Sequence, residues 1–399
     1  MSKSSTHCGL NWATLSAAAT EPSTRQCYDP TGVAITLKAN DEKASGGEGI
    51  VYTVPGKPGI LVKVYKRETL ENPVKAQTLR RRIEAMCANG SCKGMHGLAW
   101  PLMPVYGDAA RGKLIGFAMR ACKGVPFSSI FAGPASVKAK FPSWNRCQLA
   151  KTAVNFVRRV RELSEVGVFV NDFNPANFWV DEHCNVSFID ADSFQLTDRS
   201  GRAMITHTFF ASHAAPELLA NPSALNRPRT IEQVAFSTAL VVFQLLMCGY
   251  HPYSYQGVQG GCGCGSPDEK LRVGRCPLGI GADCRLPDGW YRLWSYLSGK
   301  VKNSLITTFR DGHSNPPVRT SLNDLEFALN GLLITMAKDP DPDRVSLNPT
   351  KVKSRQWIQT PPPVYPSRGF LRPQNYPRGP YKRPGGGYEQ RGLFAVGQY

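Results

Sequence analysis

Two acids and an amide lie close together in the middle of the sequence, at a spacing suited to chemistry. Asp172 is followed five residues later by Asn177, and Asp190 comes thirteen residues after that. The residues between them alternate in an apolar, strand-like way, which predicts a hairpin that ends on the second acid. This layout is typical of phosphoryl transfer: Asp172 would orient an attacking hydroxyl, and Asn177 and Asp190 would hold Mg²⁺ ions on nucleotide phosphates.

The elements that must position these residues form a β-rich region followed by a helical one. Alternating apolar residues predict strands at 33–39, 50–54, 60–65, 98–103 and 113–119. A 3.6-residue period predicts helices at 74–88, 145–165, 234–247, 291–305 and 322–336. This order indicates an α+β fold with a β-rich N-lobe and an α-helical C-lobe.

Composition divides the chain into four segments. We expect a flexible N-terminal segment at 1–30, an N-lobe at 31–122, a C-lobe at 123–340 with a Gly/Cys-rich insert at 255–288, and a disordered tail at 350–399. No apolar run approaches 18 residues and the N-terminus has no sustained apolar core, so neither a membrane span nor a secretory signal is expected. Most cysteines are scattered singly, which favours reduced thiols and a cytoplasmic protein.

From about residue 33 to 335 the chain resembles the eukaryotic-type protein kinase fold. The segment 44–52, A-S-G-G-E-G-I-V-Y, resembles the glycine-rich loop that covers the phosphates of ATP. The resemblance implies that Val51 packs on adenine and that Lys63 binds the α- and β-phosphates. Backbone amides would approach phosphate at the three glycines of the loop: Gly46, Gly47 and Gly49.

Further matches extend the resemblance along both lobes. Glu84 is the only acid in the predicted helix 74–88 and would pair with Lys63, and Met119 is assigned to the nucleotide site. The segment 213–219, H-A-A-P-E-L-L, resembles the A-P-E anchor of kinases. Its Glu217 would pair with a buried arginine, for which Arg319 is the candidate.

Departures from the usual pattern point to an atypical branch. Val-Asn-Asp at 170–172 replaces His-Arg-Asp, and Asn174 replaces a lysine near the γ-phosphate. Asp-Ala-Asp at 190–192 replaces Asp-Phe-Gly, so Asp192 is added to the expected magnesium ligands Asn177 and Asp190. N-D-F-N-P-A-N-F-W-V and I-D-A-D-S-F-Q-L resemble bacterial kinase-like proteins of stress or tellurite-resistance clusters. That resemblance implies a PP2C-type phosphatase and a von Willebrand A domain protein as partners.

Three functions stay open at this level. The first is an ATP-dependent serine/threonine protein kinase that acts on a protein substrate with ATP and Mg²⁺. The second is a pseudokinase that binds nucleotide as a scaffold, which the loss of His-Arg and of the lysine favours. The third is a small-molecule phosphotransferase, which the D-x-D pattern and Asn174 favour.

Two further features lie outside this constellation. Four thiols at Cys262, Cys264, Cys276 and Cys284 could hold Zn²⁺, stay free or form a redox pair. Residues 351–399 carry nine of the Lys/Arg residues and one acid, interleaved with Pro, Gly and Tyr. Such a tail could bind nucleic acid by charge and stacking, dock a partner, be autophosphorylated or act as a linker.

Overall fold

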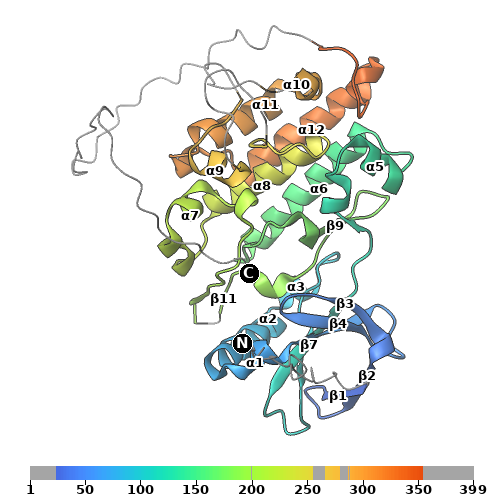
Figure 1. Ribbon diagram of the computed structural model, residues 1–399, viewed down its shortest axis with the longest axis vertical. Coiled ribbons are helices and arrows are strands. Elements are labelled where there is room, and N and C mark those ends of the chain that lie inside the picture. The colour runs from blue at the N-terminus through green and yellow to red at the C-terminus, as the bar shows by residue number, and fades with distance from the viewer. Residues whose placement is uncertain (1–23, 199, 255–265, 279–285, 287, 354–399) are drawn as a thin grey trace, which may run out of the picture. The chain divides into compact units, whose positions relative to one another are not determined.

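The computed structural model describes residues 24–198, 200–254, 266–278, 286 and 288–353 (Figure 1). These residues belong to one compact unit, Met1–Gln359, and a second unit, Thr360–Tyr399, lies outside the described residues. Of the basic tail at 350–399, the structure describes only residues 350–353, which hydrogen-bond to Asp343 and Asp339. The other predictions for the tail concern residues that it does not describe. The same holds for most of the Gly/Cys-rich insert.

The N-terminal region is a curled antiparallel sheet with three helices. Its strands run in the order β2-β1-β6-β7-β5-β4-β3. Their bounds are β1 (Thr24–Tyr28), β2 (Ala34–Lys38), β3 (Glu42–Ser45), β4 (Gly49–Thr53), β5 (Ile60–Tyr65), β6 (Met103–Tyr106) and β7 (Leu114–Arg120). The helices between β5 and β6 are α1 (Arg67–Glu71), α2 (Pro73–Ala88) and α3 (Gly90–Lys93).

Strand alternation gives the two faces of this sheet different partners. One face, which includes Val62 and Val64, closes on a small core of its own against β1 and β2. The opposite face joins the large core shared with the helical region. The register pairs Val51 with Lys63 and Lys63 with Phe117, and paired residues share a face. Lys63 therefore points toward the helical region.

Two predictions about this region are wrong. Residues 1–30 are not flexible throughout, because Thr24–Tyr28 forms β1, pairs along its length with β2 and buries Cys27. The expected strand at 98–103 is instead an irregular segment, and β6 begins only at Met103. There the Ala99 amide donates to the Phe188 carbonyl at 2.9 Å, so these apolar residues are buried against a hairpin of the helical region.

The helical region begins after Gly124 and is built around three long helices. These are α6 (Arg146–Glu165), α8 (Ile231–Leu246) and α12 (Leu322–Lys338), green to orange in Figure 1, and α6 packs against both of the others. Asn145 and Gln148 form a capping box at the start of α6. Helix α8 is buried on nearly every side, which accounts for its uniformly apolar sequence.

Shorter elements complete this region. The helices are α4 (Phe127–Ile130), α5 (Pro134–Lys140), α7 (Pro216–Ala220), α9 (Pro267–Arg272), α10 (Asp288–Ser295) and α11 (Gly299–Ile306). The strands are β8 (Val125–Pro126), β9 (Phe178–Val180), β10 (Val186–Phe188), β11 (Leu196–Thr197) and β12 (Ala203–Met204). The single helix predicted at 291–305 is therefore two helices, because Ser298 caps a new start by accepting from the Val301 amide.

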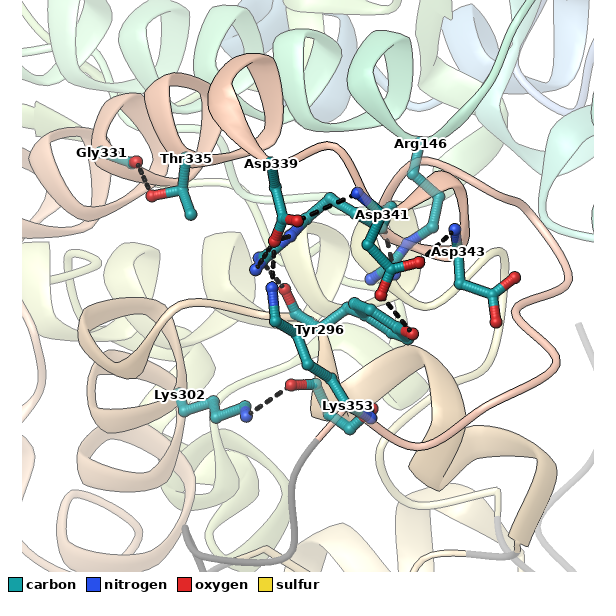
Figure 2. A network of polar contacts seen from close by, with 11 residues as sticks. Arg146, Tyr296, Lys302, Gly331, Thr335, Asp339, Asp341, Asp343 and Lys353 are labelled. Carbon is teal, nitrogen blue, oxygen red and sulfur yellow. Dashed lines mark hydrogen bonds and ion pairs between the residues drawn. The ribbon is translucent and has the colours of Figure 1, made fainter.

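The segment that follows α12 is tied back onto the turn between α10 and α11 (Figure 2). Asp339 accepts hydrogen bonds from Arg344 at 2.8 Å and from Lys353. Arg344 also donates to the Tyr296 carbonyl at 2.7 Å, and the Tyr296 hydroxyl donates to Asp341 at 3.0 Å. These bonds fix the last described residues on the helical region. None of the helices in the described residues is long and apolar enough to cross a membrane.

Candidate active site

The hairpin predicted from the sequence brings the amide and the second acid together. Strands β9 and β10 pair Phe178 with Phe188, and beyond that pair the Ile189 amide donates to the Asn177 carbonyl at 2.9 Å. Phe156 of α6 packs under both phenyl rings, with ring centroids 4.9 Å from Phe178 and 5.5 Å from Phe188. This aromatic base on α6 fixes the open end of the hairpin, where Asp190 follows.

Asp172 has one oxygen bonded and one buried without a partner. Its Oδ2 accepts from Asn177 Nδ2 at 3.2 Å. Its Oδ1 is buried and has no hydrogen-bond partner among the described residues. Burial, and then the nearby charge of Asp190, raise the pKa of Asp172 above its ordinary value, although the Asn174 backbone and the Asn177 side chain oppose the shift. An unbonded buried acceptor is costly, so Oδ1 is suited to receive a hydroxyl from outside the chain.

Asp190 sits in a strained backbone conformation at the edge of the site. Its φ of 57° lies in the left-handed region, which is uncommon for residues other than glycine and concentrates at functional sites. Its Oδ1 accepts from Lys63 Nζ at 2.7 Å, while its side chain keeps 37% exposure. Burial and the neighbouring Asp192 raise the pKa of Asp190. Asp190 is therefore held by Lys63 but is still reachable from solvent.

Asp192 is the more deeply buried partner of Lys63. Both of its oxygens accept from Lys63 Nζ, at 2.9 and 2.8 Å, and Oδ2 also accepts from the Tyr65 hydroxyl at 2.7 Å. Burial alone would raise the pKa of Asp192, but Lys63 and Tyr65 hold it below its ordinary value. The same two acids raise the pKa of Lys63 against its own burial. Lys63 is thus charged and fixed, and both oxygens of Asp192 are engaged by Lys63 and Tyr65.

The expected pair between Lys63 and Glu84 is wrong in this structure. Glu84 instead binds Arg80 one turn earlier on α2, with Nε and Oε1 2.9 Å apart, and its side chain is 42% exposed. The α2 residue that faces the site is Arg82, which is buried with Ile83 and Met86. Because α-helix neighbours two apart lie on different faces, Glu84 and Arg82 cannot both face inward.

Arg82 holds the chain that follows the acids. Its guanidinium donates to the carbonyls of Phe194 at 2.8 Å, Ile205 at 2.7 Å and Met204 at 3.2 Å. These carbonyls belong to the segment that leads from Asp192 through β11 and β12. Helix α2 therefore binds this segment through the guanidinium of Arg82.

The glycine turn precedes β4 as predicted, but the strand that leads into it is β3, which the sequence did not predict. A Cβ on Gly49 would meet the Val64 carbonyl at 2.7 Å, so a glycine is required there for close approach to β5. A Cβ on Gly46 or Gly47 would meet little or nothing, which leaves the tip of the turn open. Val51, partly buried on the Lys63 face, and Met119, paired with Leu61, line the same side of the sheet.

The structure shows where some of the predicted metal ligands lie. Among the described residues, no group of three or more His, Cys, Asp or Glu side chains is arranged to hold a metal ion. Asn177 and Asp190 both lie at the open end of the β9–β10 hairpin and carry side-chain oxygens, which suit Mg²⁺ when phosphates supply further ligands. Of the four thiols proposed for zinc, Cys262, Cys264 and Cys284 lie outside the described residues, and Cys276 is buried in the helical core.

The structural anchor predicted for the helical region is confirmed. Arg319 binds Glu217 through two parallel bonds, Nη1 to Oε1 at 2.9 Å and Nη2 to Oε2 at 2.8 Å. The Arg319 side chain is 1% exposed and also donates to the Gly312 carbonyl. A bidentate pair of this kind fixes α7 against the chain before α12.

Sequence reasoning missed Tyr65 and Arg82. Tyr65 lies two residues after Lys63 on the same strand, so period-2 alternation places both on one face. Arg82 shares the helix face of Leu79, Ile83 and Met86, a face that the sequence did predict. The strand alternation could therefore have identified Tyr65, and the helical period could have identified Arg82.

A curled sheet that holds a buried lysine against an acid-bearing hairpin, followed by a helical region, defines a protein-kinase-like fold. No family model matches the chain. Over 227 residues it is 29% identical to the protein called Protein kinase YegI in two strains of Escherichia coli. The match covers 57% of this chain but only 34% of that relative, so the chain spans about a third of its length. This similarity is to a protein that is named as a protein kinase, and it agrees with the kinase-like fold of this chain.

Proposed function

We propose that this protein is an atypical ATP-dependent protein kinase that transfers the γ-phosphoryl group of ATP to serine or threonine hydroxyls of a protein substrate. The observation that carries this proposal is the buried, unbonded Oδ1 of Asp172, close enough to Asp190 for that charge to raise its pKa. Asp190 links the two groups: its charge acts on Asp172, and its carboxylate binds Lys63. A site with an unbonded carboxylate oxygen and a fixed ammonium is suited to a hydroxyl and a phosphate.

Each residue of the site has a role that follows from its contacts. Asp172 Oδ1 accepts the hydrogen bond of the attacking hydroxyl and orients the oxygen. Asn177 fixes Asp172 through the bond to Oδ2. Lys63 holds a full charge where phosphate oxygens approach the Val51 and Met119 face of the sheet. The open tip of the glycine turn covers the phosphates.

Magnesium fits the site through two oxygen donors. Asn177 turns its amide nitrogen to Asp172, so its amide oxygen is the atom that can coordinate a cation. Asp190 has the partly exposed carboxylate beside it. When bound there with ATP, Mg²⁺ would neutralise the charge that builds on the transferring phosphoryl group. Both residues are proposed as its ligands.

Labelled ATP with Mg²⁺ and a mixture of protein acceptors tests the proposal. We expect Asp172→Asn and Asp190→Asn to lower transfer by about 100-fold or more, the usual contribution of a positioned base or metal ligand. Glu182→Gln is the matched control, because Glu182 lies on the turn of the same hairpin and is 77% exposed. Equal labelling by the wild type and all three variants would contradict the proposal.

The same assay separates the two alternatives. A pseudokinase would bind ATP and show no transfer in any variant. A small-molecule phosphotransferase would label small hydroxyl compounds and leave proteins unlabelled. The phosphatase and von Willebrand A domain partners, zinc binding and the role of the basic tail stay proposals that need binding experiments with the full chain.

A further inference from the structure

Lys63 lies between two carboxylates that differ in burial. Asp192 contacts the ammonium with both oxygens and its side chain is 3% exposed. Asp190 contacts it with one oxygen at 2.7 Å and is 37% exposed. A buried ion pair persists only when its hydrogen bonds are complete, whereas an exposed carboxylate can exchange partners. Asp192 is thus the fixed partner of Lys63 and Asp190 the exchangeable one.

Tyr65 completes the surroundings of Asp192. Its hydroxyl donates to Oδ2 at 2.7 Å, and its ring is buried against Phe117 with centroids 6.0 Å apart. Lys63 and Tyr65 come from alternate positions of β5, so one rigid strand supplies all three bonds to Asp192. A carboxylate bound in this way has little capacity left for a metal ion.

Helix α2 supplies no acid to Lys63. Glu84 is engaged with Arg80 on the outer face of that helix, and Arg82 faces inward and binds backbone carbonyls. The counter-charge for Lys63 therefore comes from the turn that also carries Asp190. A shift of α2 would disturb the carbonyls that Arg82 holds and would leave the Lys63 pair intact.

We propose that Asp192 is the positioning residue of Lys63. It keeps the ammonium oriented toward the phosphates when Asp190 turns to the metal, and the lysine site is complete without any acid from α2. This inference rests on the proposed function for its catalytic consequence, but its effect on nucleotide binding stands separately. Regulation through α2 would then act on Phe194, Met204 and Ile205, whose carbonyls Arg82 binds, and would not act on Lys63.

The experiment compares Asp192→Asn with Asp190→Asn and Glu84→Gln for ATP affinity in EDTA and in Mg²⁺, and for the rate of transfer. Asp192→Asn should weaken ATP binding roughly ten- to a hundredfold in both conditions, as for residues that hold a binding group in place. Asp190→Asn should weaken binding chiefly with Mg²⁺ present. Glu84→Gln should stay within about twofold, because its ion pair is exposed.

A double-variant cycle guards against a folding artefact. Lys63→Met combined with Asp192→Asn should bind ATP no more weakly than Lys63→Met alone, because the two residues act as one unit. Additive losses would overturn the proposal, as would a loss in Asp192→Asn that appears only with Mg²⁺, which is the behaviour of a metal ligand. If the variants change ATP affinity as expected but the wild type transfers no phosphoryl group, the proposed function fails and the role of Asp192 stands.

Discussion

Two buried histidines, one just before α7 and one after α8, should make the protein acid-sensitive. His213 and His251 have ring centroids 5.1 Å apart and are 3% and 6% exposed. Neutral His251 uses both nitrogens: Nε2 donates to the Ser212 carbonyl and Nδ1 accepts from the Tyr253 amide. His213 lies between the Ser212 hydroxyl and the Gln244 side-chain oxygen. Each ring would have to lose an accepted bond to be protonated.

Burial lowers the pKa of His213 to about 4, and burial together with the charge of His213 lowers the pKa of His251 to about 3, from ordinary values of 6.5. A group with a depressed folded pKa binds fewer protons when folded, so its contribution to stability is complete above pH 6.5 and is lost as pH falls. At pH 5 relative to pH 7.5, this linkage costs about 2 kcal/mol for one histidine and up to about 4 kcal/mol for both.

Urea unfolding of the wild type, His213→Gln, His251→Gln and the double variant at pH 5 to 7.5 measures this effect. The double variant should lose most of the acid sensitivity, even though it is less stable at pH 7.5. His183→Gln is the control, because that side chain is 75% exposed. The raised pKa values of Asp172 and Asp190 act in the opposite direction and cancel in the comparison. If the wild type and the double variant show the same pH dependence, the buried-histidine reasoning is refuted.

Three further outcomes are expected. Glu217→Gln should destabilise the fold by about 2–4 kcal/mol in thermal or urea unfolding, because it leaves Arg319 charged and buried without its acid. Gly49→Ala should weaken ATP binding measured by titration by about tenfold or more, since its Cβ meets the β5 backbone and displaces the turn. A crystal structure should show one ordered water between Arg229 and Asn171, whose unpaired buried polar atoms line a cavity of about 10 Å³.

The sequence predicted the parts of the site that depend on local pattern. The β9–β10 hairpin follows from period-2 alternation. Asn177 directly precedes its first strand and Asp190 follows its second, so both lie at the open end, as expected. The Glu217–Arg319 pair followed from the family resemblance and was confirmed in geometry. Helix α2 was predicted with the right apolar face, but Glu84 was placed in the site because it is the only acid in that helix. The helical period places Glu84 off that face, and this would have excluded it from the site.

What sequence could not predict depends on contacts between distant segments. The bond from Lys63 to Asp192 joins residues 129 positions apart and exists only because β5 meets the turn after β10. The irregular segment at 98–103 is apolar like a strand, but the Ala99 amide bonds to the hairpin and the segment buries Trp100. In both cases tertiary packing decided the outcome over local preference.

These contacts explain why the substitutions in the Asp-Ala-Asp segment do not by themselves argue against catalysis. Replacing a glycine by Asp192 introduces a charge that would be costly in the interior unless it were paired. Here it is paired completely, by Lys63 and Tyr65, and Glu84 is free of that task. The departure from the usual kinase pattern at 192 and the outward position of Glu84 are therefore linked, as two parts of one alternative way to hold the same lysine.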